Sequence, residues 1–218
     1  MPAELDRLRE LVAGREWFHS WSRGHHAGID DTPAKLNWLD FPESLKGKSV
    51  LDVGSYDGYF AFGSERRGAA RVVASDKRCW EPVGLAYWRG FDVAHWALGS
   101  KVEKRLISVE YISPASVGKF DVVLFLGVPH HTQDPMRYLR HMFRVCSETL
   151  IIETHTDGND YDEPMMVFYL DDGLLPEGRP ERRSVQFLGS ERSPHAPPSK
   201  AAVPNAAEAP AVCRRGRR

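Results

Sequence analysis

Two carboxylates and two glycines lie within one short stretch of the chain, SVLDVGSYDGYFAF, residues 49–62. Asp52 is part of an apolar run, and Gly54 and Gly58 follow it four residues apart. Asp57 lies between these glycines. Glycine permits the sharp bend and the close backbone approach that a loop around a small ligand needs. Carboxylates beside such a loop can accept hydrogen bonds from an amine or from hydroxyls. The stretch therefore predicts a ligand-binding turn between a strand and a helix.

A further acid indicates which ligand this turn would bind. Asp76 ends the next apolar run, about 20 residues after the first glycine, where a carboxylate can accept both hydroxyls of a ribose. The loop itself reads D-x-G-x-x-x-G and differs from the dinucleotide fingerprint G-x-G-x-x-G. Asp52 and Asp57 would repel a pyrophosphate, but they suit a cationic amine and a sulfonium. S-adenosylmethionine carries both groups and is the predicted cofactor, and a nucleotide-dependent oxidoreductase is the less favoured alternative.

Alternating strands and helices are expected to position these residues. The hydrophobic pattern predicts strands over residues 48–54, 70–76, 102–109, 120–128 and 148–156, and helices over residues 59–67, 83–98 and 135–145. Alternation of this kind, with nearly continuous Val, Leu and Ile runs, indicates an α/β fold with a mostly parallel sheet covered on both faces. In such a sheet the ligand binds outside the carboxyl ends of the strands.

Composition divides the chain into three segments. Residues 1–47 hold an amphipathic helix over 3–13 and an aromatic- and histidine-rich stretch with a short helix near Lys35–Leu39, which we expect to form a lid or substrate segment. Residues 48–170 form the expected S-adenosylmethionine-binding domain. Residues 171–218 are rich in Pro, Ala, Arg and Ser, and we expect an irregular, disordered tail in which only SVQFLG resembles a strand.

Three motifs in order, VLDVGSYDG, VVASD and FDVVLFLGVPHH, resemble those of the class I S-adenosylmethionine-dependent methyltransferases. More narrowly, the chain is similar to the branch of the tRNA wobble-uridine carboxymethyltransferases and their uncharacterised relatives. This likeness covers residues 15–170. It rests on the segments WFHS, LKGKSVLDVGSYDGYFAF, ERRGA and GKFDVVLFLGV, on Asp134–Pro135, and on the ETH at Glu153–His155.

The resemblance implies a Rossmann-like three-layer sandwich whose sheet ends in two antiparallel strands. Residues 171–218 offer only one strand candidate, so we expect the C-terminal strands to be missing or altered. The fifth strand would then have an exposed edge. A chain altered in this way could bind S-adenosylmethionine without catalysing methyl transfer.

The resemblance also implies roles for individual residues. It assigns Asp52, Gly54, Ser55 and Gly58 to the methionine end of the cofactor, Asp76 to the ribose, Glu110 to the adenine, and Gly127 and Val128 to the surroundings of the transferred methyl group.

One departure from the relatives concerns the type of cofactor. Relatives often read G-V-L-Y-H where this chain has GVPHH, so His130 replaces the tyrosine that helps to hold a carboxylated cofactor. The N-terminal lysines of those enzymes have no clear counterpart. Ordinary S-adenosylmethionine is therefore preferred, and transfer of a carboxymethyl group to tRNA is the alternative.

Histidines are the candidates for acid–base chemistry, because methyl transfer needs alignment of the nucleophile and, for some acceptors, removal of a proton. His131 follows the fourth strand and His19 lies in the expected lid, so both are predicted catalytic residues. Each could instead have a structural role, in ordering a loop or in the core. Further substrate-pocket candidates are Trp17, His130, Glu153 and His155.

Composition limits the partners and the compartment. The 218-residue chain has a formal net charge of −1, so no strong overall field attracts nucleic acid or a membrane. Its three cysteines are far apart and suit a reducing compartment, and no apolar run reaches the ~20 residues of a membrane span. We expect a cytoplasmic enzyme without a metal site, acting on a small molecule or on tRNA. The acceptor and the oligomeric state are not encoded in any pattern that we recognise.

Overall fold

The computed structural model describes residues 17–20, 32, 35, 36, 39–81, 88–132 and 134–154, together with three strands at 165–169, 184–188 and 211–214. The predicted helix over 3–13 and the candidate residue His155 lie outside the described residues.

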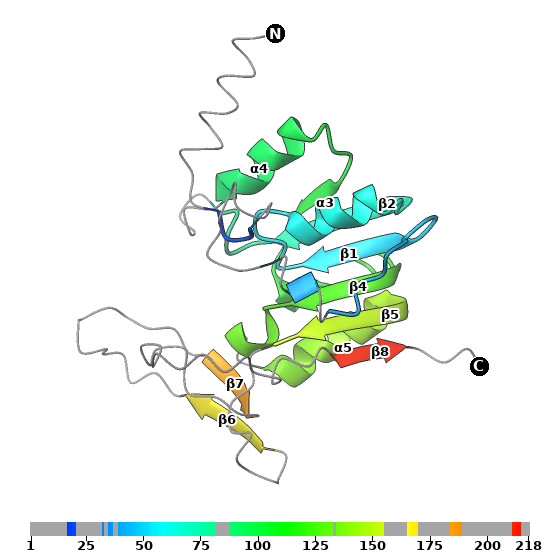
Figure 1. The fold of residues 1–218 in the computed structure, drawn as a ribbon. Helices are drawn as coiled ribbons and strands as arrows, with labels where there is room; N and C mark the ends of the chain where they lie inside the picture. The colour runs from blue at the N-terminus through cyan, green and yellow to red at the C-terminus, as the bar shows by residue number, and fades with distance from the viewer. Residues whose placement is uncertain are drawn as a thin grey trace, which may run out of the picture.

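Five of the six strands in the main sheet are parallel, and their chain order reverses beside the first strand (Figure 1). The sheet order is β3-β2-β1-β4-β5-β8. In parallel sheets such a reversal opens a crevice at the carboxyl ends of the strands. The predicted turn follows β1 and therefore lies at this crevice. The five strands are β1 (Ser49–Val53), β2 (Arg71–Asp76), β3 (Glu103–Leu106), β4 (Phe120–Leu126) and β5 (Cys146–Glu153).

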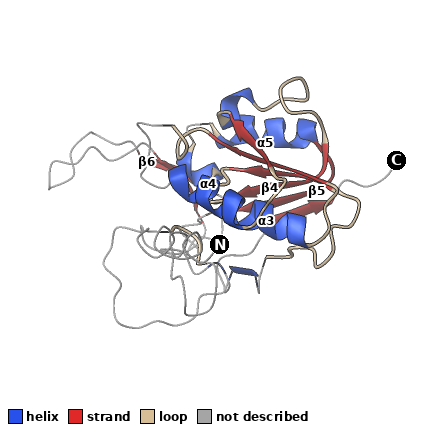
Figure 2. Cartoon of the chain, turned by 90° about the horizontal axis from the view of Figure 1, so that it is seen from above, coloured by secondary structure: helices blue, strands red, loops and turns tan. Residues whose placement is uncertain are grey.

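Helices cover both faces of the sheet, as Figure 2 shows, and the strand residues alternate between the two resulting cores. α3 (Tyr59–Arg66) and α4 (Trp88–Ala97) cover one face, and α5 (Pro135–Val145) covers the other. Val50 packs toward the first face, whereas its neighbour Leu51 packs toward the second. This two-sided burial explains the continuous apolar runs of β1 and β4. The predicted Rossmann-like three-layer α/β sandwich is confirmed.

The start of α5 illustrates how local sequence positions an element beside the crevice. The Asp134 side chain accepts a hydrogen bond from the Arg137 backbone N–H at 2.9 Å, and Pro135 occupies the first helical position. A side-chain cap and a proline without an N–H both satisfy the start of a helix. Two short 3-10 turns, η1 (Val109–Tyr111) and η2 (Pro129–His131), follow β3 and β4 at the crevice.

The C-terminal part of the chain holds more strands than the sequence predicted. β7 (Ser184–Leu188) matches the predicted SVQFLG strand and pairs with β6 (Met165–Tyr169), which was not predicted. β8 (Ala211–Arg214) runs antiparallel to β5 over Thr149–Ile152. The expectation of an exposed β5 edge is therefore wrong over these residues. β8 was not predicted because alanine and proline are frequent around residues 201–212. The AVCR segment is also short and lacks a turn signal beside it. β7 lies beside η2. The rest of residues 171–218 lies outside the described part of the chain.

None of the helices within the described residues is both long and apolar enough to span a membrane.

Candidate functional site

The turn after β1 is held in a bent conformation at the crevice. Gly54 has a φ of +76°, in the left-handed region that L side chains rarely adopt. A Cβ atom on Gly54 would lie 2.3 Å from Val128 Cγ2, so the turn and the loop after β4 are in close contact. Gly58 also has a positive φ, and a Cβ there would meet the rings of Phe62 and Phe91. Both predicted glycines are thus required by the backbone path.

Asp52 is a buried carboxylate at the base of this turn. Its side chain is 3 % exposed, and its Oδ2 accepts a hydrogen bond from the Ser55 hydroxyl at 2.7 Å. Burial raises the pKa of Asp52 to about 6, although the Ser55 hydroxyl and the nearby His19 both oppose the shift. A cation that approached this carboxylate would favour its ionised form. Asp52 therefore suits the binding of a ligand amine.

Asp76 ends β2 at the same crevice and is also buried. Its two carboxylate oxygens accept backbone N–H groups, from Tyr56 at 3.1 Å and from Cys79 at 2.9 Å. Burial raises the pKa of Asp76, and these hydrogen bonds oppose the shift. Each oxygen keeps lone-pair capacity for a further donor such as a ribose hydroxyl. The structure thus brings Asp52, Ser55, Asp76 and both glycines together, as the motif predicted.

Asp57 has a different role from the one its position in the motif suggested. Its Oδ2 accepts the backbone N–H groups of Phe18 at 3.1 Å and His19 at 3.0 Å, and its Oδ1 pairs with His19 Nδ1. The carboxylate is 1 % exposed. Asp57 therefore holds the N-terminal segment against the turn. His19 is itself buried, and Trp17 lies in the apolar core beside Gly90 of α4.

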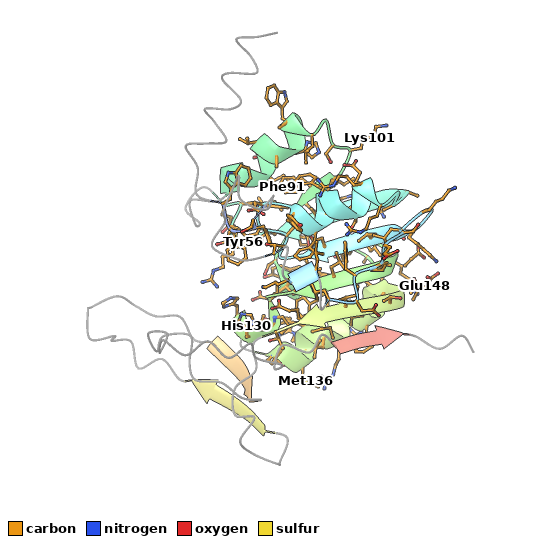
Figure 3. All side chains as sticks on the ribbon, in the orientation of Figure 1. Tyr56, Phe91, Lys101, His130, Met136 and Glu148 are labelled. Carbon is orange, nitrogen blue, oxygen red and sulfur yellow. The ribbon has the colours of Figure 1, made fainter. Side chains whose placement is uncertain are left out.

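The loop after β4 contains Gly127 and Val128, the residues predicted to lie near the transferred methyl group. The Gly127 N–H donates to the Glu153 carbonyl at 3.0 Å, which joins the ends of β4 and β5. His130 is buried, and its Nδ1 lies 3.2 Å from Thr154 Oγ1. His131 is exposed, and its ring centroid lies 4.1 Å from that of His130. Figure 3 shows Tyr56 and His130 on the side where the parallel strands have their carboxyl ends, whereas Glu148 lies on the opposite side.

Glu153 ends β5 and is a fourth buried acid at the carboxyl ends of the strands, after Asp52, Asp57 and Asp76. Its side chain is 4 % exposed. Lys35 Nζ lies 3.4 Å from Glu153 Oε1 and comes from the N-terminal segment. Lys35 was not predicted as a site residue, because no local feature of the sequence shows that it reaches Glu153 at the end of β5.

Glu110, the predicted adenine contact, lies in η1 after β3 and is exposed. Its Oε1 accepts a hydrogen bond from the Tyr138 hydroxyl of α5 at 3.4 Å. This contact places Glu110 at the carboxyl end of the sheet, and its role toward a ligand stays a prediction.

The assembled site combines buried acids, a bent glycine turn and histidines of different exposure. Within the described ranges, no group of three or more His, Cys, Asp or Glu side chains could hold a metal ion. The acids suit a ligand with a cationic amine and hydroxyl groups, and the exposed imidazole of His131 has a nitrogen that can accept a proton.

Comparison with known proteins shows to which family the chain belongs. A family model described as a methyltransferase domain matches residues 29–193. Similar curated proteins include a ubiquinone biosynthesis O-methyltransferase of Dechloromonas aromatica (strain RCB), 36 % identical over 61 % of this chain and 53 % of that protein. A tRNA U34 carboxymethyltransferase of Psychromonas ingrahamii is 27 % identical over 88 % of this chain and 56 % of that protein. The chain spans about half the length of these curated relatives.

A solved structure supports the fold independently. The N-terminal domain of EvdMO1, crystallised in the presence of SAH and D-fucose, matches 84 % of this chain and 78 % of that chain, with a TM-score of 0.59 and 20 % sequence identity. The family match spans most of the chain, and it agrees with the sheet order and with the turn that follows β1. The chain belongs to the methyltransferase domain family.

Proposed function

We propose that the protein binds S-adenosylmethionine at the carboxyl edge of β1, β2 and β4 and transfers its methyl group to an acceptor by in-line displacement. One observation carries the proposal: two buried acids, Asp52 near the end of β1 and Asp76 at the end of the paired β2, lie at the carboxyl ends of the strands where the Gly54 turn begins. The family match and the relatives named as methyltransferases support it.

The residues present fit this cofactor by the chemistry of their donor set. Asp52 would accept hydrogen bonds from the amine, and Asp76 would accept them from the ribose hydroxyls. The backbone at Gly127 and Val128 would pass beside the reacting methyl group, since Val128 contacts the Gly54 turn. Bound S-adenosylmethionine would supply an electrophilic methyl group on a sulfonium.

His131 is the proposed base, and His19 is not. His131 is exposed on η2 at the crevice, so it can reach an acceptor and take up its proton. His19 is 6 % exposed, and its Nδ1 is engaged by Asp57. Burial of this kind leaves His19 little access to an acceptor. Acceptors that attack as thiolates or carboxylates would need no base, so the effect of removing His131 also reports on the acceptor's chemistry.

Turnover with labelled S-adenosylmethionine tests the proposal. The small-molecule and tRNA fractions of a cell extract serve as acceptors, and we expect labelled product in one of them. His131→Asn should lower the yield of labelled product. The control His95→Asn should not, because His95 lies on α4 with its Nε2 3.0 Å from the Val102 carbonyl oxygen. Binding without any labelled product in either fraction would favour a non-catalytic cofactor-binding protein.

Transfer of a carboxymethyl group to tRNA is a second candidate. The match to the tRNA U34 carboxymethyltransferase covers 88 % of this chain, compared with 61 % for the O-methyltransferase. Lys35 also brings a cation to the crevice, although Glu153 pairs with it. Calorimetric titration with S-adenosylmethionine and with its carboxylated form separates the two candidates, because the enzyme should bind its own cofactor more tightly. A cytoplasmic location stays a prediction, which cell fractionation would test.

A further inference from the structure

The segment Trp17–Ser20, here called the strap, crosses the turn that would bind the cofactor. Its Ser20 N–H donates to Thr32 Oγ1 at 3.3 Å, and Thr32 is fully buried. Trp17 is buried against α4, so the strap is anchored on both sides of His19. The strap is therefore a packed part of the site edge.

Asp57 makes the polar contacts between the strap and the turn. Two backbone N–H groups and one imidazole nitrogen of the strap approach its two oxygens. Hydrogen bonds to an ionised acceptor are about twice as strong as those between neutral groups. Three of the roughly four acceptor sites of this 1 % exposed carboxylate face the strap, so little of its capacity is left for a ligand. Asp57 thus differs from Asp52, although both lie in the same motif.

Tyr56 connects this attachment to the ribose-side acid. It is a non-glycine residue with a φ of +55°, and its ring stacks on that of Phe18 with centroids 4.4 Å apart. Its backbone N–H donates to Asp76, and its carbonyl accepts from Trp80 Nε1 at 2.6 Å. A left-handed backbone at tyrosine persists only where its surroundings fix it. The strap is one of those surroundings.

We propose that Asp57 is a positioning residue that fastens the strap to the turn, so that strap attachment holds the Tyr56 backbone and Asp76 in their binding geometry. The proposal rests on the proposed function, because it assigns a cofactor to this turn. Asp57 touches the strap and not the cofactor, and its effect on the cofactor passes through Tyr56. His19 then serves as the attachment point of the strap.

Graded variants of Asp57 test this role. Asp57→Ala removes both acceptor oxygens, whereas Asp57→Asn keeps one for the strap N–H groups. The matched control is Asp121→Ala, because Asp121 Oδ2 also accepts a backbone N–H and a side-chain group, both from Ser49 at 2.8 Å, but at the start of β1 and β4. The first readout is the calorimetric affinity for S-adenosylhomocysteine. The second is hydrogen exchange of a peptide that contains the Phe18 and His19 amides.

We expect Asp57→Ala to weaken S-adenosylhomocysteine binding by about tenfold or more and to speed exchange of the strap amides by a similar factor. Asp57→Asn should be intermediate in both readouts. Asp121→Ala should lower the melting temperature and leave the affinity within about twofold. In the unsubstituted protein, S-adenosylhomocysteine should slow exchange of the strap amides, and this protection should be lost in Asp57→Ala.

Two results would overturn the proposal. One is an unchanged affinity in Asp57→Ala whose strap amides exchange rapidly, because the strap would then be irrelevant to the cofactor. The other is an equal loss of affinity in Asp121→Ala, which would indicate general destabilisation. If Asp57→Ala does not fold, Asp57→Asn and His19→Ala provide the same comparison. Failure of the unsubstituted protein to bind S-adenosylhomocysteine would instead refute the proposed function.

Discussion

Replacing Gly54 by alanine tests the geometry of the turn directly. The substitution has two separate costs. Alanine at a φ of +76° costs about 1–2 kcal/mol because of the left-handed backbone. Its Cβ would also lie 2.3 Å from Val128 Cγ2, and overpacking of this kind costs about 1–3 kcal/mol. Gly54→Ala should therefore lower the free energy of unfolding by about 2–5 kcal/mol.

Gly47 provides the matched control. It has the same φ of +76°, and a Cβ there would meet nothing within 4 Å. Gly47→Ala should show the backbone cost alone, about 1–2 kcal/mol. The difference between the two variants in urea denaturation measures the contact between the β1 turn and Val128. In a Val128→Ala background, Gly54→Ala and Gly47→Ala should cost the same, because the contact is then absent. Equal destabilisation by Gly54→Ala and Gly47→Ala would refute the close contact of the two loops.

Three further predictions address the charges and the sheet edge. The folded-state pKa of Asp52, about 6, lies above its unfolded value of about 3.9, so its contribution to stability is present below about pH 4 and is lost as pH rises through 6. Asp52→Asn should thus be more stable than the unsubstituted protein at pH 8, by about 1–3 kcal/mol, and no such gain at that pH in thermal unfolding would contradict the burial of Asp52. Lys35→Met leaves the buried Glu153 carboxylate without this partner and should lower the free energy of unfolding by about 1–3 kcal/mol, and Glu153→Gln in the same chain should restore part of the loss in a denaturation titration. Removing residues 211–218 takes β8 from β5 and should increase self-association in size-exclusion chromatography, whereas an unchanged elution volume would argue against the β5–β8 pairing.

The central sheet and the cofactor-side residues could be predicted because their signals are local. Buried parallel strands produce continuous apolar runs, and the run ending near Asp52 and the one ending at Asp76 gave β1 and β2 within one or two residues of the observed bounds. Parallel pairing then places the two ends at the same edge without further information. Gly54, Ser55 and Gly58 follow from the bend that the turn requires.

The contacts that the sequence did not reveal are those between distant segments. Asp57 reaches Phe18 and His19, which lie 39 and 38 residues earlier in the chain, and Lys35 reaches Glu153 across 118 residues. No periodicity encodes such pairs, because they depend on how the N-terminal segment packs over the finished sheet. β8 was missed for the same reason, since its four residues gain their strand geometry from pairing with β5.

Calorimetric titration of the protein with S-adenosylhomocysteine and with NAD tests the central claim most directly. The turn at residues 52–58 is proposed to hold the cationic amino-acid end of an adenosyl sulfonium cofactor. From this binding mode we expect that S-adenosylhomocysteine binds and NAD does not, that Asp52→Ala abolishes the binding, and that binding at about pH 6 releases protons as Asp52 ionises. Tight binding of NAD, with no response to S-adenosylhomocysteine and no effect of Asp52→Ala, would contradict it.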